Sequence, residues 1–250
     1  KLDKITARIK KQTYDLNQDH IDYMEVVKKT ISGLHDGITT TELDNLAAET
    51  AASLSSTHPD YSFLASRIAL TRLYKSLVKP FSKNAKIIYE TGFISEEVYE
   101  VIKNNARKIN SMIVGDRDFN IDYFGFKTLE RSYLLKVGGE IAECPQYMYM
   151  RVALGIWGDD WDNVQKTYDM LSEGMFTHAT PTLFNSGTPC NQLASCFLIG
   201  NKSDSIDGLF DTLKDVAHIS KWAGGVGLHV HSVRANGSPI KGTGGKSDGL

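Results

Sequence analysis

Residues 178–198 of the chain read HATPTLFNSGTPCNQLASCFL, and they mark a change in the character of the sequence. The stretch is rich in Thr, Ser, Asn and Pro, and its apolar pieces are short. Its end, Ser195–Ile199, predicts a buried strand because a short apolar run follows turn-forming residues. The next residues predict a helix from Ile206 to about Trp222 and a second strand from Val226 to Val233. A strand, a helix and a strand in this order form a βαβ unit, which predicts a parallel sheet.

The residues before position 178 predict helices packed on helices. Apolar side chains recur at helical spacing, as at Leu2, Ile5 and Ile9, with Lys and Arg between them. Thr39 and Glu42 form a capping-box pattern, which is typical of a helix start. The first part of the chain therefore predicts a compact helical unit, with helices over residues 2–9, 22–37, 39–54 and 59–77 and with Gly37 as the C-terminal cap of the second.

The middle of the chain predicts a second helical region. Residues 80–92 predict a break, and Ser95 predicts the N-cap of one continuous helix that reaches Ile113. The stretch 133–142 predicts a hairpin with a two-glycine turn. Two further helices are expected over residues 145–157 and about 159–174.

Composition and charge exclude several classes of protein. The chain has 250 residues, 41% of them hydrophobic, so disorder is not expected. Its 28 Lys and Arg nearly balance 30 Asp and Glu, which gives no overall attraction to nucleic acid or to an anionic membrane. No stretch approaches the roughly 18 consecutive apolar residues of a membrane span. The basic, amphipathic N-terminus has no apolar core and is therefore not a secretory signal.

The cysteines indicate a reducing compartment and no metal site. Three cysteines, Cys144, Cys190 and Cys196, are too few for a disulfide framework, so we expect a cytoplasmic protein. His229 and His231 follow later, but neither they nor the cysteines have the spacing of zinc ligands. Two histidines at this spacing are expected on one face of a strand.

Residue patterns alone leave the chemistry open. The glycine-rich pieces GGVG (224–227) and GTGG (242–245) can bring backbone N–H groups to a phosphate, but they are equally typical of ordinary turns. Cys196 lies in a predicted apolar strand, where a lone cysteine is more often an inert small hydrophobe than a reactive thiol.

Long motifs in fixed order resolve these alternatives by resemblance. They are HATPTLFNSGT (178–188), QLASCFL (192–198), DSIDGLFDTLK (204–214), SKWAGGVGLHV (220–230) and VRANGSPIKGTGG (233–245). HPDYSFLASRIA (58–69), RDFNIDYFGFKTLERSYLLK (117–136) and PQYMYMRVALGIW (145–157) precede them. The chain resembles the large catalytic subunit of class I ribonucleotide reductase, of the eukaryotic type, over nearly its whole length.

The resemblance implies a mainly α chain in three parts. Residues 1–79 correspond to a helical ATP cone without its N-terminal hairpin, and residues 80–192 to a helical connecting region. Residues 193–250 correspond to the opening βαβ unit of a ten-stranded α/β barrel. In the family, the thiyl-radical cysteine, a second redox cysteine and a shuttle cysteine pair lie downstream of these motifs. We therefore expect the front end of a longer protein, inactive by itself.

The implied activity is the reduction of ribonucleoside diphosphates to deoxyribonucleoside diphosphates by thiyl-radical chemistry. The subunit is expected to hold no prosthetic group. ATP, dATP and other deoxyribonucleoside triphosphates, with Mg²⁺, are the implied effectors. The implied partners are a small subunit whose di-iron centre supplies the radical, thioredoxin or glutaredoxin as reductant, and a second copy of the chain in a homodimer or larger assembly.

Site residues follow from the motif positions. Cys196 corresponds to one of the two redox cysteines, and Thr180, Ser195 and Gly225 to substrate contacts; Thr180 stands where the family usually has Ser. The implied contacts to the specificity effector are Asp204, Ser205, Ile206, Lys221, Arg234, Ile240, Lys241 and Gly242. Those of the ATP cone are Lys4 and Lys75 for phosphate, and Thr40 and Asp44 for the adenine end. Cys144 and Cys190 depart from the family and are interpreted as neutral substitutions.

Two expectations complete the sequence-based interpretation. The alternative function is a non-catalytic, nucleotide-sensing regulatory module with an ATP cone, such as a repressor, which would lack the further cysteines beyond Leu250. The second expectation concerns Cys190 and Cys196, which are close enough in sequence for a disulfide to be conceivable. We predict no disulfide, with Cys190 exposed in the polar loop and Cys196 facing the cavity that Ser195 and the Gly224-Gly225 turn also reach.

Overall fold

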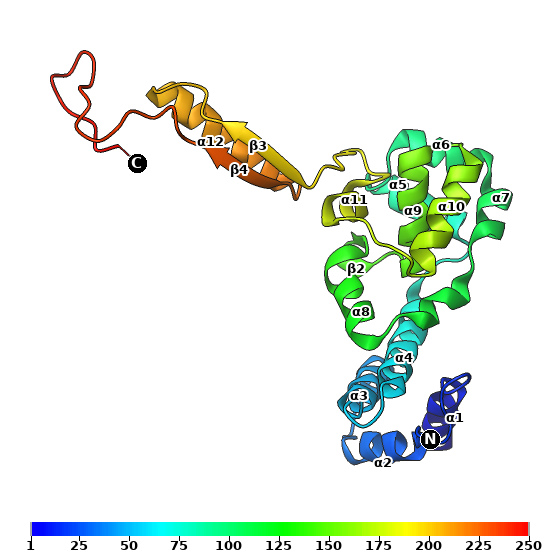
Figure 1. Cartoon of the computed structure of the whole chain (residues 1–250). Helices are drawn as coiled ribbons and strands as arrows, with labels where there is room; N and C mark the ends of the chain where they lie inside the picture. The colour runs from blue at the N-terminus through cyan, green and yellow to red at the C-terminus, as the bar shows by residue number, and fades with distance from the viewer. Residues whose placement is uncertain (1, 250) are drawn as a thin grey trace. The chain divides into compact units, whose positions relative to one another are not determined.

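A computed structural model describes residues 2–249 of the chain (Figure 1). The chain divides into two units: residues 1–177 with 187–189, and residues 178–186 with 190–250. The first unit holds nearly all of the helices, and the second holds the βαβ unit. The predicted domain boundaries at residues 79 and 192 remain predictions, because neither coincides with a boundary between these two units.

Four helices form the N-terminal part of the first unit, and α3 packs closely against α4 (Figure 1). The Thr39 hydroxyl accepts from Glu42 N and the Glu42 carboxylate accepts from Thr39 N, as the capping box predicts. Gly37 is not the cap of the second helix, which ends at Ser32 because the Gly33 N–H already bonds to carbonyls of its last turn. The helices are α1 (Leu2–Lys11), α2 (Tyr23–Ser32), α3 (Thr40–Ser53) and α4 (Asp60–Ser76).

Two predictions for the middle of the chain are wrong. Residues 80–92 contain a helix, α5 (Phe81–Glu90), which follows Pro80 and buries Phe81 and Ile88 on one face. The helix predicted over residues 95–113 is two helices, α6 (Glu96–Asn104) and α7 (Ala106–Met112). The break falls at Asn105, whose side-chain amide donates to Val101 O at 2.9 Å and so competes with the backbone ladder.

The rest of the first unit contains the predicted hairpin and the two predicted helices. Short elements that the sequence did not predict precede the hairpin: a 3₁₀ helix η1 (Gly115–Asn120), α8 (Tyr123–Thr128) and a π-helical turn η2 (Leu129–Tyr133). The hairpin strands pair antiparallel, and α9 packs against α10. The bounds are β1 (Lys136–Val137), β2 (Glu140–Ile141), α9 (Pro145–Trp157) and α10 (Trp161–Ser172).

The second unit contains the predicted βαβ unit and one helix that was not predicted. Strands β3 (Cys196–Gly200) and β4 (Gly225–His229) pair in parallel, and α12 (Ile206–Lys221) connects them. The second strand ends at His229 rather than at Val233, so the prediction that His229 and His231 share one strand face is wrong: His231 lies in the turn that follows. The short helix α11 (Thr180–Asn185) lies in the polar run. The prediction that β3 is buried is wrong for the described residues, since Leu198 is 91% exposed. Helix α12 covers only one face of the two strands, so alternate side chains of β3 remain uncovered.

A buried carboxylate joins α4 to η1 and α9 in the first unit. Asp118 is fully buried, and its oxygens accept hydrogen bonds from the hydroxyl of Tyr74 and from Gln146 N, the latter at 3.1 Å. The side chain of the N-cap residue of α9 accepts no hydrogen bond from the first turn of the helix. Asp118, from another segment, accepts one in its place. Burial raises the pKa of Asp118 to about 6, although the hydrogen bonds act in the opposite direction.

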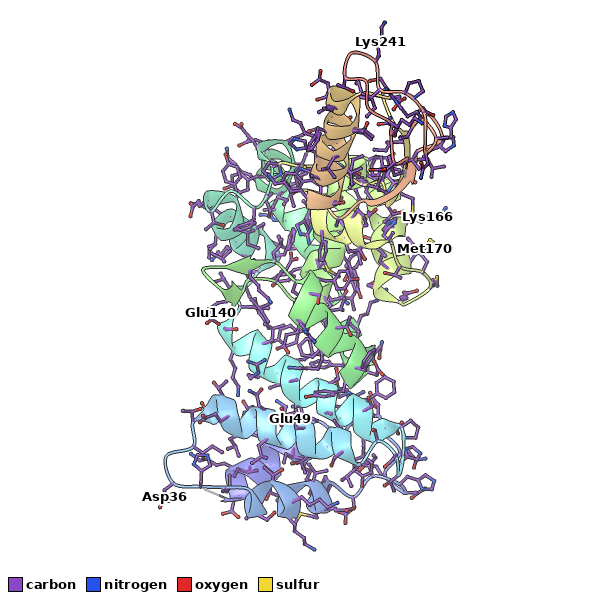
Figure 2. All side chains as sticks on the ribbon, turned by 90° about the vertical axis from the view of Figure 1, so that its left-hand side faces the viewer. Asp36, Glu49, Glu140, Lys166, Met170 and Lys241 are labelled. Atoms are coloured by element: carbon purple, nitrogen blue, oxygen red, sulfur yellow. The ribbon has the colours of Figure 1, made fainter. Side chains whose placement is uncertain are left out.

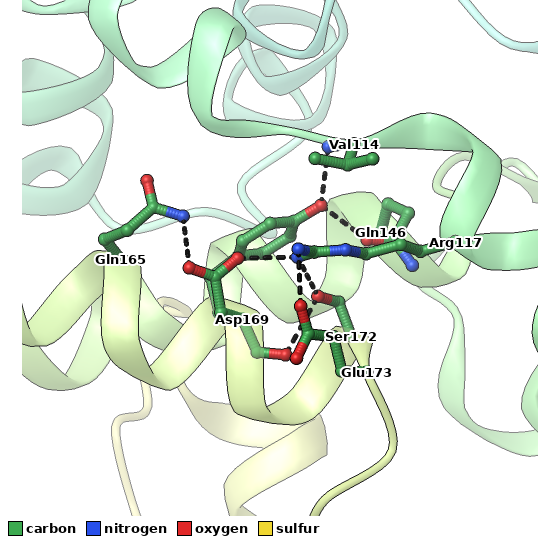
Figure 3. Close-up of polar contacts among 8 residues, drawn as sticks. Val114, Arg117, Gln146, Gln165, Asp169, Ser172 and Glu173 are labelled. Atoms are coloured by element: carbon green, nitrogen blue, oxygen red, sulfur yellow. Dashed lines mark hydrogen bonds and ion pairs between the residues drawn. The ribbon is translucent and has the colours of Figure 1, made fainter.

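A second polar network ties α10 to the segment before η1 and to α9 (Figure 3). The Tyr168 hydroxyl accepts from Val114 N at 2.8 Å and donates to Gln146 Oε1 at 2.5 Å. The Arg117 guanidinium donates to Asp169 and to Glu173, each at 2.6 Å. The bonds of Tyr168 satisfy its own buried hydroxyl and the side-chain oxygen of Gln146, whereas the ion pairs of Arg117 are partly exposed.

The hairpin is fixed by a buried ion pair. Arg151 of α9 donates to Glu143 through Nε at 3.0 Å and Nη2 at 2.8 Å, and both side chains are completely or almost completely buried. Glu143 also accepts from Leu135 N at 3.0 Å. Loss of either partner would leave a charge buried and unpaired, which costs about 3–5 kcal/mol.

Within residues 2–249, no helix is both long and apolar enough to cross a membrane.

Replacing Asp118 with Asn should remove a pH dependence of folding. Its pKa is raised from 3.8 to about 6 by folding, so the unfolded chain loses this proton first as the pH rises. The parent's free energy of unfolding should therefore fall by about 2.4 kcal/mol more than that of Asp118→Asn between pH 4 and pH 7. Urea denaturation at both pH values measures this difference.

The exposed neighbour Asp116 provides the control, since Asp116→Asn removes the same charge without a buried carboxylate. Its unfolding free energy should follow that of the parent over the whole range. A constant difference between parent and Asp118→Asn at all pH values would contradict the raised pKa.

Candidate functional site

The beginnings of the two parallel strands bring together a thiol, a hydroxyl and a glycine backbone. Cys196 is the register partner of Gly225, and Gly225 N donates to Ser195 O at 2.7 Å. The Ser195 hydroxyl lies 3.7 Å from Cys196 Sγ and can donate to it. Both side chains are exposed. A molecule at this edge can meet the thiol and the hydroxyl at once, with glycine backbone beside them.

Glycine is required where α12 returns to β4. A Cβ at Gly224 would lie 2.6 Å from Ile219 Cγ2 and 2.8 Å from Phe197 Cε2. A Cβ at Gly225 would lie 3.2 Å from Ser195 O, against the strand it pairs with. Ala223 before them has a φ of +63°, which costs free energy in a residue with a side chain. The turn therefore brings the backbone at Gly224 close to two side chains and the backbone at Gly225 close to the Ser195 carbonyl.

Thr180 reaches the same unit through α11, where it is the first helical residue. Thr182 Oγ1 donates to Leu193 O at 3.2 Å, and Asn185 Nδ2 donates to Gln192 O at 2.8 Å. These bonds attach α11 to the segment that leads into β3. The sequence analysis did not single out Asn185 or Gln192; both lie within the quoted motifs, but side-chain amides in a polar loop carry no specific signal of their own.

The cysteines differ sharply in environment. All three are thiols rather than disulfides, as predicted for Cys190 and Cys196. Cys190 is half-buried, so the prediction that it is exposed is wrong: the loop folds back on itself, and Gln192 N donates to Cys190 O at 2.9 Å. Cys144 is buried, and burial beside Asp118 raises the pKa of its thiol. Cys196 is exposed and adjoins the Ser195 hydroxyl.

The opposite end of the βαβ unit gathers most of the predicted effector residues. Ser205 caps α12 and accepts from Gly208 N at 3.0 Å. Arg234 donates through Nε to the Asp204 carboxylate at 2.6 Å and through Nη2 to Asp204 O at 3.0 Å. Its Nη1 also donates to Pro239 O at 3.3 Å. One guanidinium therefore joins the start of α12 to the glycine-rich loop.

That loop carries Ile240, Lys241 and Gly242, and Lys241 projects from its tip (Figure 2). Ile206, the first residue of α12, is 76% exposed. A helix N-terminus, a cation and exposed apolar carbon suit the phosphates and the base of a nucleotide.

Lys221 is not brought to this end of the unit. It is the last residue of α12, whose 16 residues span about 24 Å, and its ammonium lies 5.1 Å from the centroid of the Trp222 ring. Within one copy of the chain it therefore belongs to the end where Gly225 and Cys196 lie.

Two adjoining cavities beside α1 and α3 contain the predicted cone residues; α4 completes the smaller one, and the loop between α2 and α3 completes the larger one. The smaller, of about 240 Å³, is lined by Asp44 and Lys75, and the larger, of about 800 Å³, by Lys4 and Thr40. Arg8 lines both. Asp44 is buried at the base, where it accepts from Arg8 and, at 3.0 Å, from Lys75 Nζ.

The cavities have cationic walls that an anionic ligand could use. Lys4, Arg8 and Lys11 lie on one face of α1, at positions i, i+4 and i+7, and Arg8 was missed by the sequence analysis although this spacing could have indicated it. Asp44 neutralises part of this charge and orients Arg8 and Lys75 through its two ion pairs. Within residues 2–249, no group of three or more His, Cys, Asp or Glu side chains could hold a metal ion.

Three family profiles match the chain, one after another along its length. The profile of the ATP cone domain matches residues 1–76, the ribonucleotide reductase all-alpha domain matches residues 119–191, and the ribonucleotide reductase barrel domain matches residues 194–250. The barrel match covers the βαβ unit with Cys196 and Gly225. The chain belongs to the ribonucleotide reductase large-subunit family.

Individual relatives of this family are similar over 99% of the chain. It is 55% identical to the ribonucleoside-diphosphate reductase large subunit of Caenorhabditis elegans, 54% to large chain 2 of Saccharomyces cerevisiae and 52% to the large subunit of Arabidopsis thaliana. The chain spans 30–33% of the length of these relatives. A barrel match is not expected of a regulatory module that carries only an ATP cone.

Alkylation should distinguish the three thiols. Iodoacetamide at pH 8 should modify Cys196 first, because its side chain is exposed, whereas buried Cys144 should react only after denaturation. Mass spectrometry of peptides from timed samples measures the order, and Cys196→Ser should remove the fast phase alone. Fast labelling of Cys144 in the native chain would contradict the structure.

Proposed function

We propose that this chain is the regulatory and substrate-binding part of an enzyme that reduces ribonucleoside diphosphates to 2′-deoxyribonucleoside diphosphates. The observation that carries the proposal is the pairing of Cys196 with Gly225, with the Ser195 hydroxyl beside the thiol, in a chain of this family. Thr180, Ser195 and the Gly225 backbone would hold the nucleotide. Cys196 would deliver reducing equivalents to the ribose.

The residue types suit this chemistry. Replacing the 2′-hydroxyl by hydrogen releases water and requires two electrons and two protons. Two thiols supply both and end as one disulfide, so Cys196 would need a partner cysteine. The partner must come from across the site, because Cys190 is a half-buried thiol in the loop before β3 and forms no disulfide with Cys196. A mobile nucleotide could reach Cys196 since its side chain is exposed.

The remaining parts of the reaction belong to other proteins and other segments. We propose that the radical cysteine and the second redox cysteine lie outside this chain, and that a small subunit with a di-iron centre supplies the radical. Thioredoxin or glutaredoxin would then reduce the disulfide. The low cysteine content favours a cytoplasmic location for such an enzyme.

The cone cavities are proposed to bind ATP or dATP, with Mg²⁺ on the phosphates. Lys4, Arg8 and Lys75 would meet the triphosphate, because charge-assisted bonds to phosphate are the strongest that these walls offer. Thr40 and Asp44 would face the adenine end. Binding would then have to separate Lys75 from Asp44, which leaves Asp44 paired with Arg8.

The Asp204–Arg234 end of the βαβ unit is proposed to bind the second effector, a nucleoside triphosphate that selects the substrate. Helix α12 exposes Leu209, Phe210 and Leu213, which a second copy of the chain would cover in a homodimer. Antiparallel packing of two α12 helices would bring Lys221 of one copy towards Asp204 of the other. The single chain keeps these two residues at opposite ends of the helix.

The redox role is tested by Cys196→Ser in the complete large subunit, assayed with its small subunit. Deoxyribonucleotide formation with thioredoxin as reductant should fall at least a thousandfold, while binding of the ribonucleoside diphosphate stays within threefold, since the hydroxyl replaces only the reducing group. Cys190→Ser should keep parental turnover. Normal turnover of Cys196→Ser would remove the redox role.

Lys75→Ala tests the cone. The variant loses one charge-assisted phosphate contact, worth about 1.5–3 kcal/mol, so the dissociation constant of dATP should rise by about 10- to 150-fold in calorimetry. Lys29→Ala serves as the matched control, because Lys29 pairs with Glu25 on the exposed face of α2 and lines neither cavity. Parental dATP affinity in Lys75→Ala would contradict this assignment.

A further inference from the structure

Two side-chain amides connect the three segments that carry the proposed substrate residues. Asn185, at the end of α11, uses both hydrogens of its amide nitrogen: it donates to Gln192 O at 2.8 Å and to Trp222 O at 3.2 Å. Residues 192 and 222 are far apart in sequence, yet they precede Ser195 and Gly225 by only three positions each. Asn185 itself is only 8% exposed, so these bonds are shielded from water.

Gln192 extends the same contact into the backbone before β3. Its Oε1 accepts from Ala194 N at 2.6 Å, and its Nε2 donates to Ala194 O at 3.0 Å and to Trp222 O at 3.4 Å. Both polar groups of residue 194 are therefore held by one side chain. This fixes the direction in which the chain enters Ser195 and Cys196.

The Trp222 carbonyl is the point where both amides converge, and it stands at the head of the strained turn. Trp222 is the C-cap of α12, Ala223 follows with its positive φ, and Gly224 leaves no room for a Cβ. A backbone in a sparsely populated conformation persists only where its surroundings determine it. The side-chain amides of Asn185 and Gln192 hold this backbone in place on the side of the proposed substrate site, because both donate to the Trp222 carbonyl.

We propose that Asn185 and Gln192 form an amide clamp and are positioning residues for substrate binding: they set the placement of Ser195 and Gly225 relative to α11, which carries Thr180. This inference rests on the proposed function. Neither Asn185 nor Gln192 needs to touch the nucleotide. Each instead holds the backbone next to Ser195 or Gly225, which are the proposed substrate contacts.

The test is Asn185→Asp in the complete large subunit. The substitution keeps the size of the side chain but directs a carboxylate oxygen at two carbonyl oxygens, so the clamp opens. The dissociation constant of the ribonucleoside diphosphate, measured by equilibrium dialysis without the small subunit, should rise at least tenfold. Affinity for the effector at the Asp204–Arg234 end should stay within twofold, since that end lies about 24 Å away along α12.

Asn191→Asp is the matched control, because it adds the same charge in the same loop on an exposed residue. It should bind substrate like the parent, which excludes simple repulsion of the diphosphate. Gln192→Glu is the second variant, since it keeps the acceptor for Ala194 N and loses only the donors. It should weaken substrate binding in the same way, and thermal melting confirms that each variant is folded.

A double variant separates positioning from general stability. If the clamp acts through Ser195, Asn185→Asp should weaken substrate binding less than threefold in a Ser195→Ala background, whereas independent effects would multiply. Parental substrate affinity in a folded Asn185→Asp, or full multiplication in the double variant, would overturn the clamp. A parent subunit that binds no ribonucleoside diphosphate would overturn the proposed function and the clamp with it.

Discussion

The parallel pairing of β3 with β4 is the constraint on which the arrangement of the candidate sites depends. Parallel strands cannot be joined by a tight turn, so the chain must cross over through α12. The crossover puts the start of α12 at the carboxyl ends of the strands, beside Asp204 and Arg234, and returns the chain at the amino ends, beside Cys196. One rigid helix thus separates a proposed effector site from a proposed substrate site by about 24 Å.

A second constraint acts in the first unit, where two adjacent residues of α4 bond to two different buried carboxylates. Lys75 lies in the cone cavity with Asp44, and Tyr74 donates its hydroxyl to buried Asp118, which also caps α9. A displacement of the end of α4 by a ligand in the cavity would therefore disturb the buried hydrogen bond between Tyr74 and Asp118. Buried networks of this kind tolerate few alternative arrangements, since an unpaired carboxylate there is costly.

The parts of the fold that the sequence predicted are those with strong local signals. The capping box at Thr39 starts a helix as expected, and the order of a predicted strand, helix and strand predicted the parallel pair. The short helix α11 was missed because long-range bonds to Leu193, Gln192 and Trp222 hold it, and these leave no local pattern. The site residues came from family motifs, whereas Arg8 and the amides emerged only from the geometry.

The central claim is that Cys196 gives up its electrons during the reaction, and a single turnover tests it most directly. The complete large subunit, with its shuttle cysteine pair replaced by serine so that it cannot re-reduce the disulfide, is reduced and freed of external thiols. It is mixed with small subunit and ribonucleoside diphosphate, then denatured and alkylated for mass spectrometry. The account predicts one disulfide that contains Cys196 for each deoxyribonucleotide formed in the first turnover. Deoxyribonucleotide formation with Cys196 still fully alkylated as a thiol would contradict it.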